Sequence, residues 1–418
     1  MRGIRQQMSS PDLNSQRSSQ LHEVKWPAAD ETRALIQDFS IVVGGPVYDF
    51  LLRIGLLRLG LPNVLRRIAV LVALTWLPLL LFSLIDGVAL GSRVKIPLLL
   101  DYAMYGRFLL ALPLLLLAEV GIDPAIRVAV KAFVDERIVQ ESDLADFEAV
   151  LRRTQRLRDA VLPELLLLLL AFFPIFVFRH EWQQGAVATW HSTAAGLTRA
   201  GWWYASVSTP LLRFVIYRWA FRYVVWIALQ WRISRLPLHL LPTHPDHAAG
   251  LYFLSFPQLR FGVLFCALGC SFAGQILNTV THEGASLASF KLLMIAFVGI
   301  AVMLNLCPLL LWAPKLIKVR RKGLREYAAL GNRYTEEFDR KWVHFSVPAA
   351  EPLLGTSDIQ SMADLANSYA VILDMSIVPI SKRLIVQLAI IAGAPLIPVV
   401  IAVTPINDVV NTVFKMVA

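Results

Sequence analysis

Long runs of apolar residues alternate along the chain with shorter stretches that are rich in charge. Seven runs are about 20 residues long, which is the length a helix needs to cross the hydrocarbon core of a bilayer. They are residues 68–84, 105–122, 161–178, 204–230, 261–280, 290–312 and 384–403. The pattern therefore predicts an all-α, polytopic membrane bundle of about seven transmembrane helices.

The segments outside these runs have their own patterns. Residues 1–33 are rich in Ser, Gln and Arg, and we expect a disordered cytoplasmic tail there. Residues 34–67 carry apolar side chains at helical spacing, which is typical of an amphipathic helix in the membrane interface, although a soluble packing helix has the same spacing. Residues 123–160 and 313–383 are predicted cytoplasmic helical segments, and 404–418 a short external tail.

Composition and the distribution of charge set the topology. Hydrophobic residues make up 56% of the chain and charged residues only 17%, too apolar a balance for an ordinary soluble protein. Of the 40 Lys and Arg residues, 30 fall in alternate segments between the predicted spans. Because basic residues concentrate on the cytoplasmic side, we predict a cytoplasmic N-terminus and an external C-terminus.

The net charge of +10 has one part that topology does not explain. The predicted cytoplasmic segments account for +7 and the external ones for zero, which leaves Arg213, Arg218 and Arg222 inside the fourth span. Arg218 and Arg222 are four residues apart and therefore share one face of a helix. Each central charge costs about 3 kcal/mol on insertion scales, so such residues usually face a partner or water.

Two interpretations of this basic helix remain open. In the first, Arg213, Arg218 and Arg222 line a hydrated cavity for an anion or a lipid headgroup, helped by the aromatic rings of Tyr217 and Trp226. In the second, the helix is tilted and the guanidinium groups form structural ion pairs, for which Glu119 and Glu164 are the candidate partners. The spacing does not repeat every third residue, which argues against a voltage sensor.

The loop between the fourth and fifth spans holds a cluster of histidines. His244, Asp246 and His247 are residue types that bind zinc or a similar ion. The same residues also suit a turn, in which Pro sets the backbone and Asp caps the next helix. The three cysteines, Cys266, Cys270 and Cys307, lie in apolar runs, which excludes a disulfide framework and a zinc knuckle.

Small residues and prolines mark two further spans. Gly262, Cys266, Cys270 and Gly274 recur every fourth residue on the fifth span, a spacing that lets two helices approach closely. Pro395 and Pro398 are expected to bend the seventh span. The two outer sets of three spans also share a faint parallel similarity that would suit an internal repeat.

Two stretches resemble a known group of proteins. Residues 245–251 (PDHAAGL) and 353–368 (LLGTSDIQSMADLANS) are similar to segments of a family of bacterial multi-pass inner-membrane proteins that has no assigned function. The resemblance implies a bacterial inner-membrane location. It implies no catalytic or binding residue.

Function is constrained mainly by what the chain lacks. The sequence contains no nucleotide-binding or hydrolase motif in a fitting context, so we expect no cofactor and lean against an enzyme. The leading hypothesis is a channel-like or secondary-transporter-like protein for a small anionic solute or a lipid. The alternatives are a membrane-bound assembly or regulatory subunit and a membrane-embedded lipid-modifying enzyme. Expected partners are the bilayer, anionic headgroups, a second copy or a protein held by the cytoplasmic helices, and not nucleic acid.

Overall fold

The computed structural model describes residues 30–53, 55, 64–177, 188–193, 196–344 and 357–403. Within them the chain is helical except for connecting turns and one short antiparallel ribbon, β1 (Ser192–Thr193) with β2 (Gly196–Leu197). The all-α class is therefore confirmed. The predicted external tail, 404–418, and most of the predicted N-terminal tail lie outside the described residues.

Five helices in the described chain are long and apolar enough to cross a membrane. They are Val64–Ile85, Tyr102–Asp135, Tyr252–Glu283, Leu287–Leu310 and Lys382–Ala402. Each matches one of the seven predicted spans to within two residues at its C-terminal end or contains it whole. The other two predicted spans are also helical, namely α8 (Val161–Val177) and the continuous helix made of α10 (Arg199–Trp203), a π-helical turn (Tyr204–Ser208) and α11 (Thr209–Ile233).

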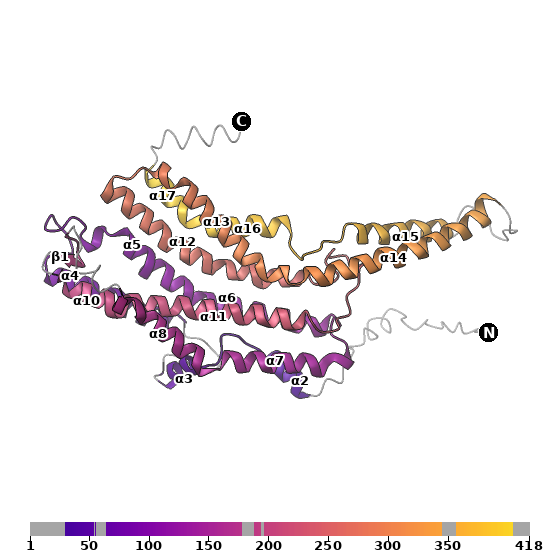
Figure 1. Ribbon diagram of the computed structural model, residues 1–418, viewed down its shortest axis with the longest axis horizontal. Coiled ribbons are helices and arrows are strands. Elements are labelled where there is room, and N and C mark those ends of the chain that lie inside the picture. Colours follow the sequence, from indigo (N-terminus) through magenta and orange to yellow (C-terminus); the bar gives the residue numbers. More distant parts are fainter. Residues whose placement is uncertain are drawn as a thin grey trace, which may run out of the picture.

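Three long helices lie side by side and form the centre of the bundle (Figure 1). They are α6 (Leu112–Asp135), α11 and α12 (Ser255–Glu283). α6 continues from α5 (Tyr102–Met104) through a π-helical turn. At 1.5 Å per residue, the 34 residues of Tyr102–Asp135 span about 50 Å, well beyond a hydrocarbon core of about 30 Å. These helices therefore continue past the membrane boundary that the apolar pattern suggests.

The remaining helices surround this centre. α4 (Val64–Ile85) and α8 pack against α11 and its π-helical turn, and α7 (Leu144–Arg158) lies along the last turns of α11. On the other side, α13 (Leu287–Leu310) and α16 (Lys382–Gly393) pack on α12. A 3-10 turn, Ala394–Leu396, separates α16 from α17 (Ile397–Val403) and contains Pro395, one of the two prolines expected to bend this span.

A helical hairpin projects from one end of the bundle (Figure 1). Its two arms are α14 (Ala313–Phe338) and α15 (Ser357–Leu373), which pack against each other. Both arms lie within the segment predicted to be helical, residues 313–383. The opposite end of the bundle carries α17 and the β1–β2 ribbon.

The small-residue face of α12 packs as predicted. An added Cβ on Gly262 would lie 3.1 Å from the side chain of Leu388 in α16, and one on Gly274 would lie 2.7 Å from the backbone oxygen of Tyr102. The small residues at four-residue spacing thus let α12 pack closely against two helices, α16 and the start of the α5–α6 helix.

The predicted interfacial helix is interrupted. α2 (Asp30–Gln37) begins within the predicted tail, and α3 (Pro46–Arg53) begins after an extended turn at 38–45. Gly44 and Gly45 have φ angles of +124° and +89°, which a right-handed helix cannot contain. We call residues 40–47 the strap. Apolar spacing alone predicts one continuous helix here. The two glycines and Pro46 of the strap divide it into α2 and α3.

Candidate functional site

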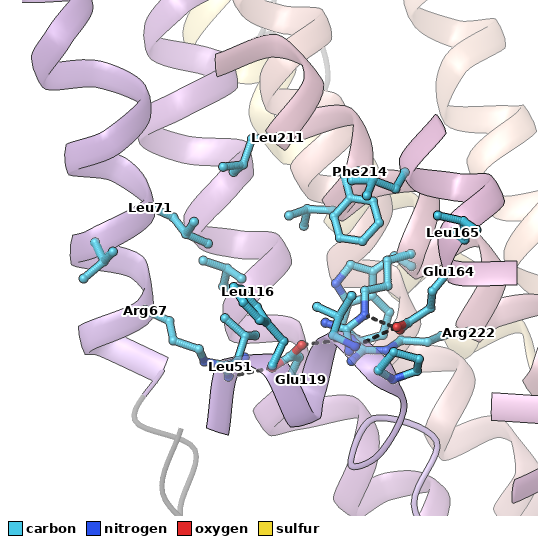
Figure 2. Close-up of a pocket in the computed structure, with 18 of the residues that line it drawn as sticks. Leu51, Arg67, Leu71, Leu116, Glu119, Glu164, Leu165, Leu211, Phe214 and Arg222 are labelled. Carbon is cyan, nitrogen blue, oxygen red and sulfur yellow. Dashed lines mark hydrogen bonds and ion pairs between the residues drawn. The ribbon is translucent and has the colours of Figure 1, made fainter. Parts of the chain in front are cut away.

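A cavity of about 580 Å³ lies between α3, α4, α6, α8 and α11. Most of its wall is apolar, and Figure 2 shows Leu71, Leu211 and Phe214 around its upper part. Several lining residues are 38–64% exposed, so the cavity opens on the surface along α4 and α8. Those residues are Val70, Leu74, Phe50, Val161, Leu165 and Leu168.

Five charged side chains close one end of this cavity, and we call them the charged floor. Glu119 binds two arginines, with 2.6 Å from Oε2 to Nη2 of Arg67 and 2.8 Å from Oε1 to Nη1 of Arg222. Arg218 Nε lies 3.2 Å from Glu164 Oε1. Each side chain is at most 11% exposed. Three cations face two carboxylates, so the floor has a formal charge of +1.

The helices set the level of the floor. Arg67 and Glu164 are each the fourth residue of their helices, α4 and α8, while Arg218 and Arg222 project from one face of α11. The floor therefore lies one turn from the start of α4 and of α8, against the middle of α11.

Arg67 retains hydrogen-bonding capacity. Its Nε is buried and has no hydrogen-bond partner among the described residues, and its Nη2 meets Glu119 as an ion pair without hydrogen-bond geometry. Buried donors are normally satisfied, and leaving one unpaired costs about 1–3 kcal/mol. Because Arg67 also lines the cavity, a bound acceptor would find an available guanidinium there.

The strap lies across the floor, and its last two residues, Pro46 and Val47, also line the cavity. The Val42 carbonyl accepts a 3.1 Å hydrogen bond from Arg222 Nη2, and the Val47 N–H donates to Glu164 Oε2 at 2.8 Å. Ser40 donates from Oγ to Asp123 at 2.5 Å. The strap is therefore bound to the same Arg222 and Glu164 that form the floor.

We expect Gly44→Ala to loosen the strap more than Gly91→Ala does. Both glycines have positive φ, so either alanine costs about 1–2 kcal/mol in backbone conformation. Only at Gly44 would the Cβ also meet side chains, at 2.5 Å from Asp159 Oδ1, whereas Gly91 has open space. Unfolding in mixed SDS micelles measures the difference. Equal losses would mean that the Arg158–Asp159 pair moves aside freely.

The three predicted binding arginines lie on two sides of α11. Arg218 and Arg222 line the cavity and are paired with Glu164 and Glu119. Arg213 is on the far side of α11, about 140° from Arg218, and its Nη1 is buried without a hydrogen-bond partner in the described part of the chain.

The two predicted aromatic residues are not in the cavity wall. Tyr217 is half-buried and absent from the lining. Trp226 is fully buried, with its ring centroid 6.4 Å from that of Phe261, and so belongs to the packing of α11 on α12.

Sequence reasoning missed two arginines. Arg67 was counted with the basic residues that precede the first span, although it shares an α4 face with Leu71 and Leu74, a pattern that could have pointed to the cavity. Arg107 was overlooked within the second span. It donates to Tyr204 Oη at 2.7 Å and to Gln275 Oε1 at 2.9 Å, joining three helices near the other end of the bundle.

The histidine loop forms a turn. Asp246 Oδ1 lies 2.8 Å from His244 Nδ1, and His247 has a φ of +53°. Burial raises the pKa of Asp246, but the hydrogen bonds that its carboxylate accepts lower it by more. The pKa of Asp246 therefore lies below its usual value. The donors are the backbone N–H groups of Ala248, Gly250 and Tyr252, with His244 as a further partner. No group of three or more potential metal ligands occurs within the described residues.

Together the bundle and its cavity define a class, an all-helical membrane protein with a laterally open apolar cavity above a buried charged floor. No protein-family model, curated protein or solved structure matches the chain.

Proposed function

We propose that this chain is a bacterial inner-membrane protein that binds a lipid in the lateral cavity and moves the lipid's phosphate-bearing headgroup across the membrane. In this proposal α8 and α10–α11 cross the bilayer with the five long apolar helices, which gives seven spans, a cytoplasmic N-terminus and a periplasmic C-terminus. The observation that carries the proposal is one cavity with apolar walls and a charged floor.

The walls favour a lipid over a small anionic solute. A soluble anion gains little from a surface made mostly of Leu, Val and Phe, whereas each CH₂ group of an acyl chain gains about 0.8 kcal/mol on burial. The exposed lining residues of α4 and α8 face the region where acyl chains would lie. The floor then receives a phosphate or carboxylate through its net positive charge.

Arg67→Gln is the sharpest test of this proposal. This substitution removes the excess positive charge of the floor but leaves no carboxylate unpaired, because Glu119 still pairs with Arg222 and Glu164 with Arg218. A charge-assisted hydrogen bond is worth about 1.5–3 kcal/mol, so we expect at least about tenfold weaker binding of phosphatidylglycerol. Native mass spectrometry in detergent with added lipid measures the binding.

The matched control is Arg66→Gln. Arg66 is the neighbouring residue on α4 and is exposed. Among the described residues it donates only to the Gly55 carbonyl, at 3.2 Å. Its variant should bind like the wild type and should also preserve the movement of fluorescent phosphatidylglycerol in proteoliposomes. If both variants bind lipid equally well, the charged floor has no part in recognition.

A second candidate function rests on the projecting hairpin. α14 and α15 extend beyond the bundle and expose Leu330 and Ile359, as a membrane-bound assembly subunit would need for a protein partner (Figure 1). Partner binding that persists in Arg67→Gln would favour this role without transport. The third hypothesis, a lipid-modifying enzyme, has no metal cluster to support it within the described chain.

A further inference from the structure

A second cavity adjoins the first on the other side of α3. It also has a volume of about 580 Å³. Polar and apolar surface contribute about equally to its lining, and we call it the polar cavity because four charged side chains, Asp49, Arg53, Arg158 and Asp159, line it. Pro46, Phe50 and Val161 line both cavities, so the two spaces share one wall. Val47 and Leu51 face the apolar cavity, while Asp49 and Arg53 face the polar one.

The charges of the polar cavity are balanced but not all paired. On the α7–α8 side, Arg158 donates to both carboxylate oxygens of Asp159, each at 2.7 Å, and also to the Ser40 carbonyl. On the α3 side, neither the Asp49 carboxylate nor the Arg53 guanidinium has a hydrogen bond or ion pair within the described chain. The cavity therefore offers one anion and one cation on exposed residues of α3, where water solvates them until a ligand binds.

Asp49 and Arg53 are four residues apart, which places their Cβ atoms about 5–6 Å from each other on one helix face. Residues at this spacing commonly pair, yet these two do not approach within ion-pair distance in the described structure. They are free to bind separate groups of one ligand. A ligand that carries an anionic and a cationic group a few bonds apart would satisfy both.

We propose that the polar cavity is a headgroup subsite for a phospholipid that carries both a phosphate and a primary amine, as phosphatidylethanolamine does. The acyl chains lie in the apolar cavity, the phosphate lies near the shared wall between Arg53 and the charged floor, and the ammonium group binds Asp49. Asp159 is less suited to this role because Arg158 already occupies both of its oxygens. The inference rests on the proposed function, since it assumes that a lipid occupies the apolar cavity.

Headgroup selectivity tests the subsite. The purified full-length protein is mixed with equal amounts of phosphatidylethanolamine and phosphatidylglycerol of identical acyl chains, and the bound lipids are counted by native mass spectrometry. We expect a several-fold preference for phosphatidylethanolamine. Asp49→Asn should bring the ratio close to one while total bound lipid stays near the wild-type level, because the apolar cavity and the charged floor are unchanged.

Asp38→Asn is the control, because Asp38 is an exposed carboxylate near the strap that does not line the polar cavity. It should leave the preference intact. Equal binding of the two lipids by the wild type, or a preference that survives Asp49→Asn, would overturn the subsite while leaving lipid binding in place. No bound lipid at all, or no effect of Arg67→Gln, would instead overturn the proposed function.

Discussion

Glu119→Gln should destabilise the protein more than any other single change in the charged floor. Glu119 is the counter-ion of both Arg67 and Arg222, and all three side chains are buried. Gln keeps the size but removes the charge, which leaves two buried guanidinium groups beside each other without an anion. Removing one partner of a buried pair costs about 3–5 kcal/mol, and here two pairs share the lost carboxylate. The free energy of unfolding in mixed SDS micelles measures the loss.

Asp135→Asn provides the matched control on the same helix. Asp135 lies at the exposed end of α6 and pairs with Lys131 at 3.6 Å, a surface pair expected to contribute about 0–1 kcal/mol. Adding Arg67→Gln to Glu119→Gln should restore part of the lost stability, because one of the two orphaned cations is removed. If Glu119→Gln lowers the free energy of unfolding no more than Asp135→Asn does, water or another anion must stabilise the two buried guanidinium groups.

The distribution of apolar residues predicts where helices exist better than where they end. All seven predicted spans are helical, because 20 apolar residues satisfy their backbone groups most simply as a helix. The Tyr102–Asp135 helix nevertheless extends 13 residues past the predicted end at Ile122. Charged residues such as Arg127 and Lys131 end a hydrophobic run but are good helix formers, so they do not end the helix.

Helical periodicity predicts which residues share a face, but not the depth at which that face lies. Spacing places Arg218 and Arg222 together, and the sequence offers Glu119 and Glu164 as partners. The level of the floor depends on how the starts of α4 and α8 align with the middle of α11, which is a tertiary arrangement. The strap is unpredictable for the same reason, since its hydrogen bonds join residues more than 80 positions apart.

Gly106→Ala should cost about 1–3 kcal/mol, the range for overpacking a close contact, and should separate two central helices. Gly106 lies in the π-helical turn before α6, and an added Cβ would lie 2.5 Å from the backbone oxygen of Cys270 in α12. Gly274 has the reciprocal position, 2.7 Å from the Tyr102 oxygen. Because backbone atoms cannot rotate away as side chains do, the helices themselves must move apart.

Gly299→Ala gives the opposite expectation and so serves as the control. Gly299 lies within α13, and an added Cβ would have no neighbour within 4 Å. Alanine favours a helix interior over glycine by about 1 kcal/mol, so this variant should be neutral or slightly more stable. The two free energies of unfolding, measured in the same mixed micelles, should therefore differ in sign. If both substitutions stabilise, α6 and α12 do not make backbone contact in the bilayer, and the spacing of small residues on α12 needs another explanation.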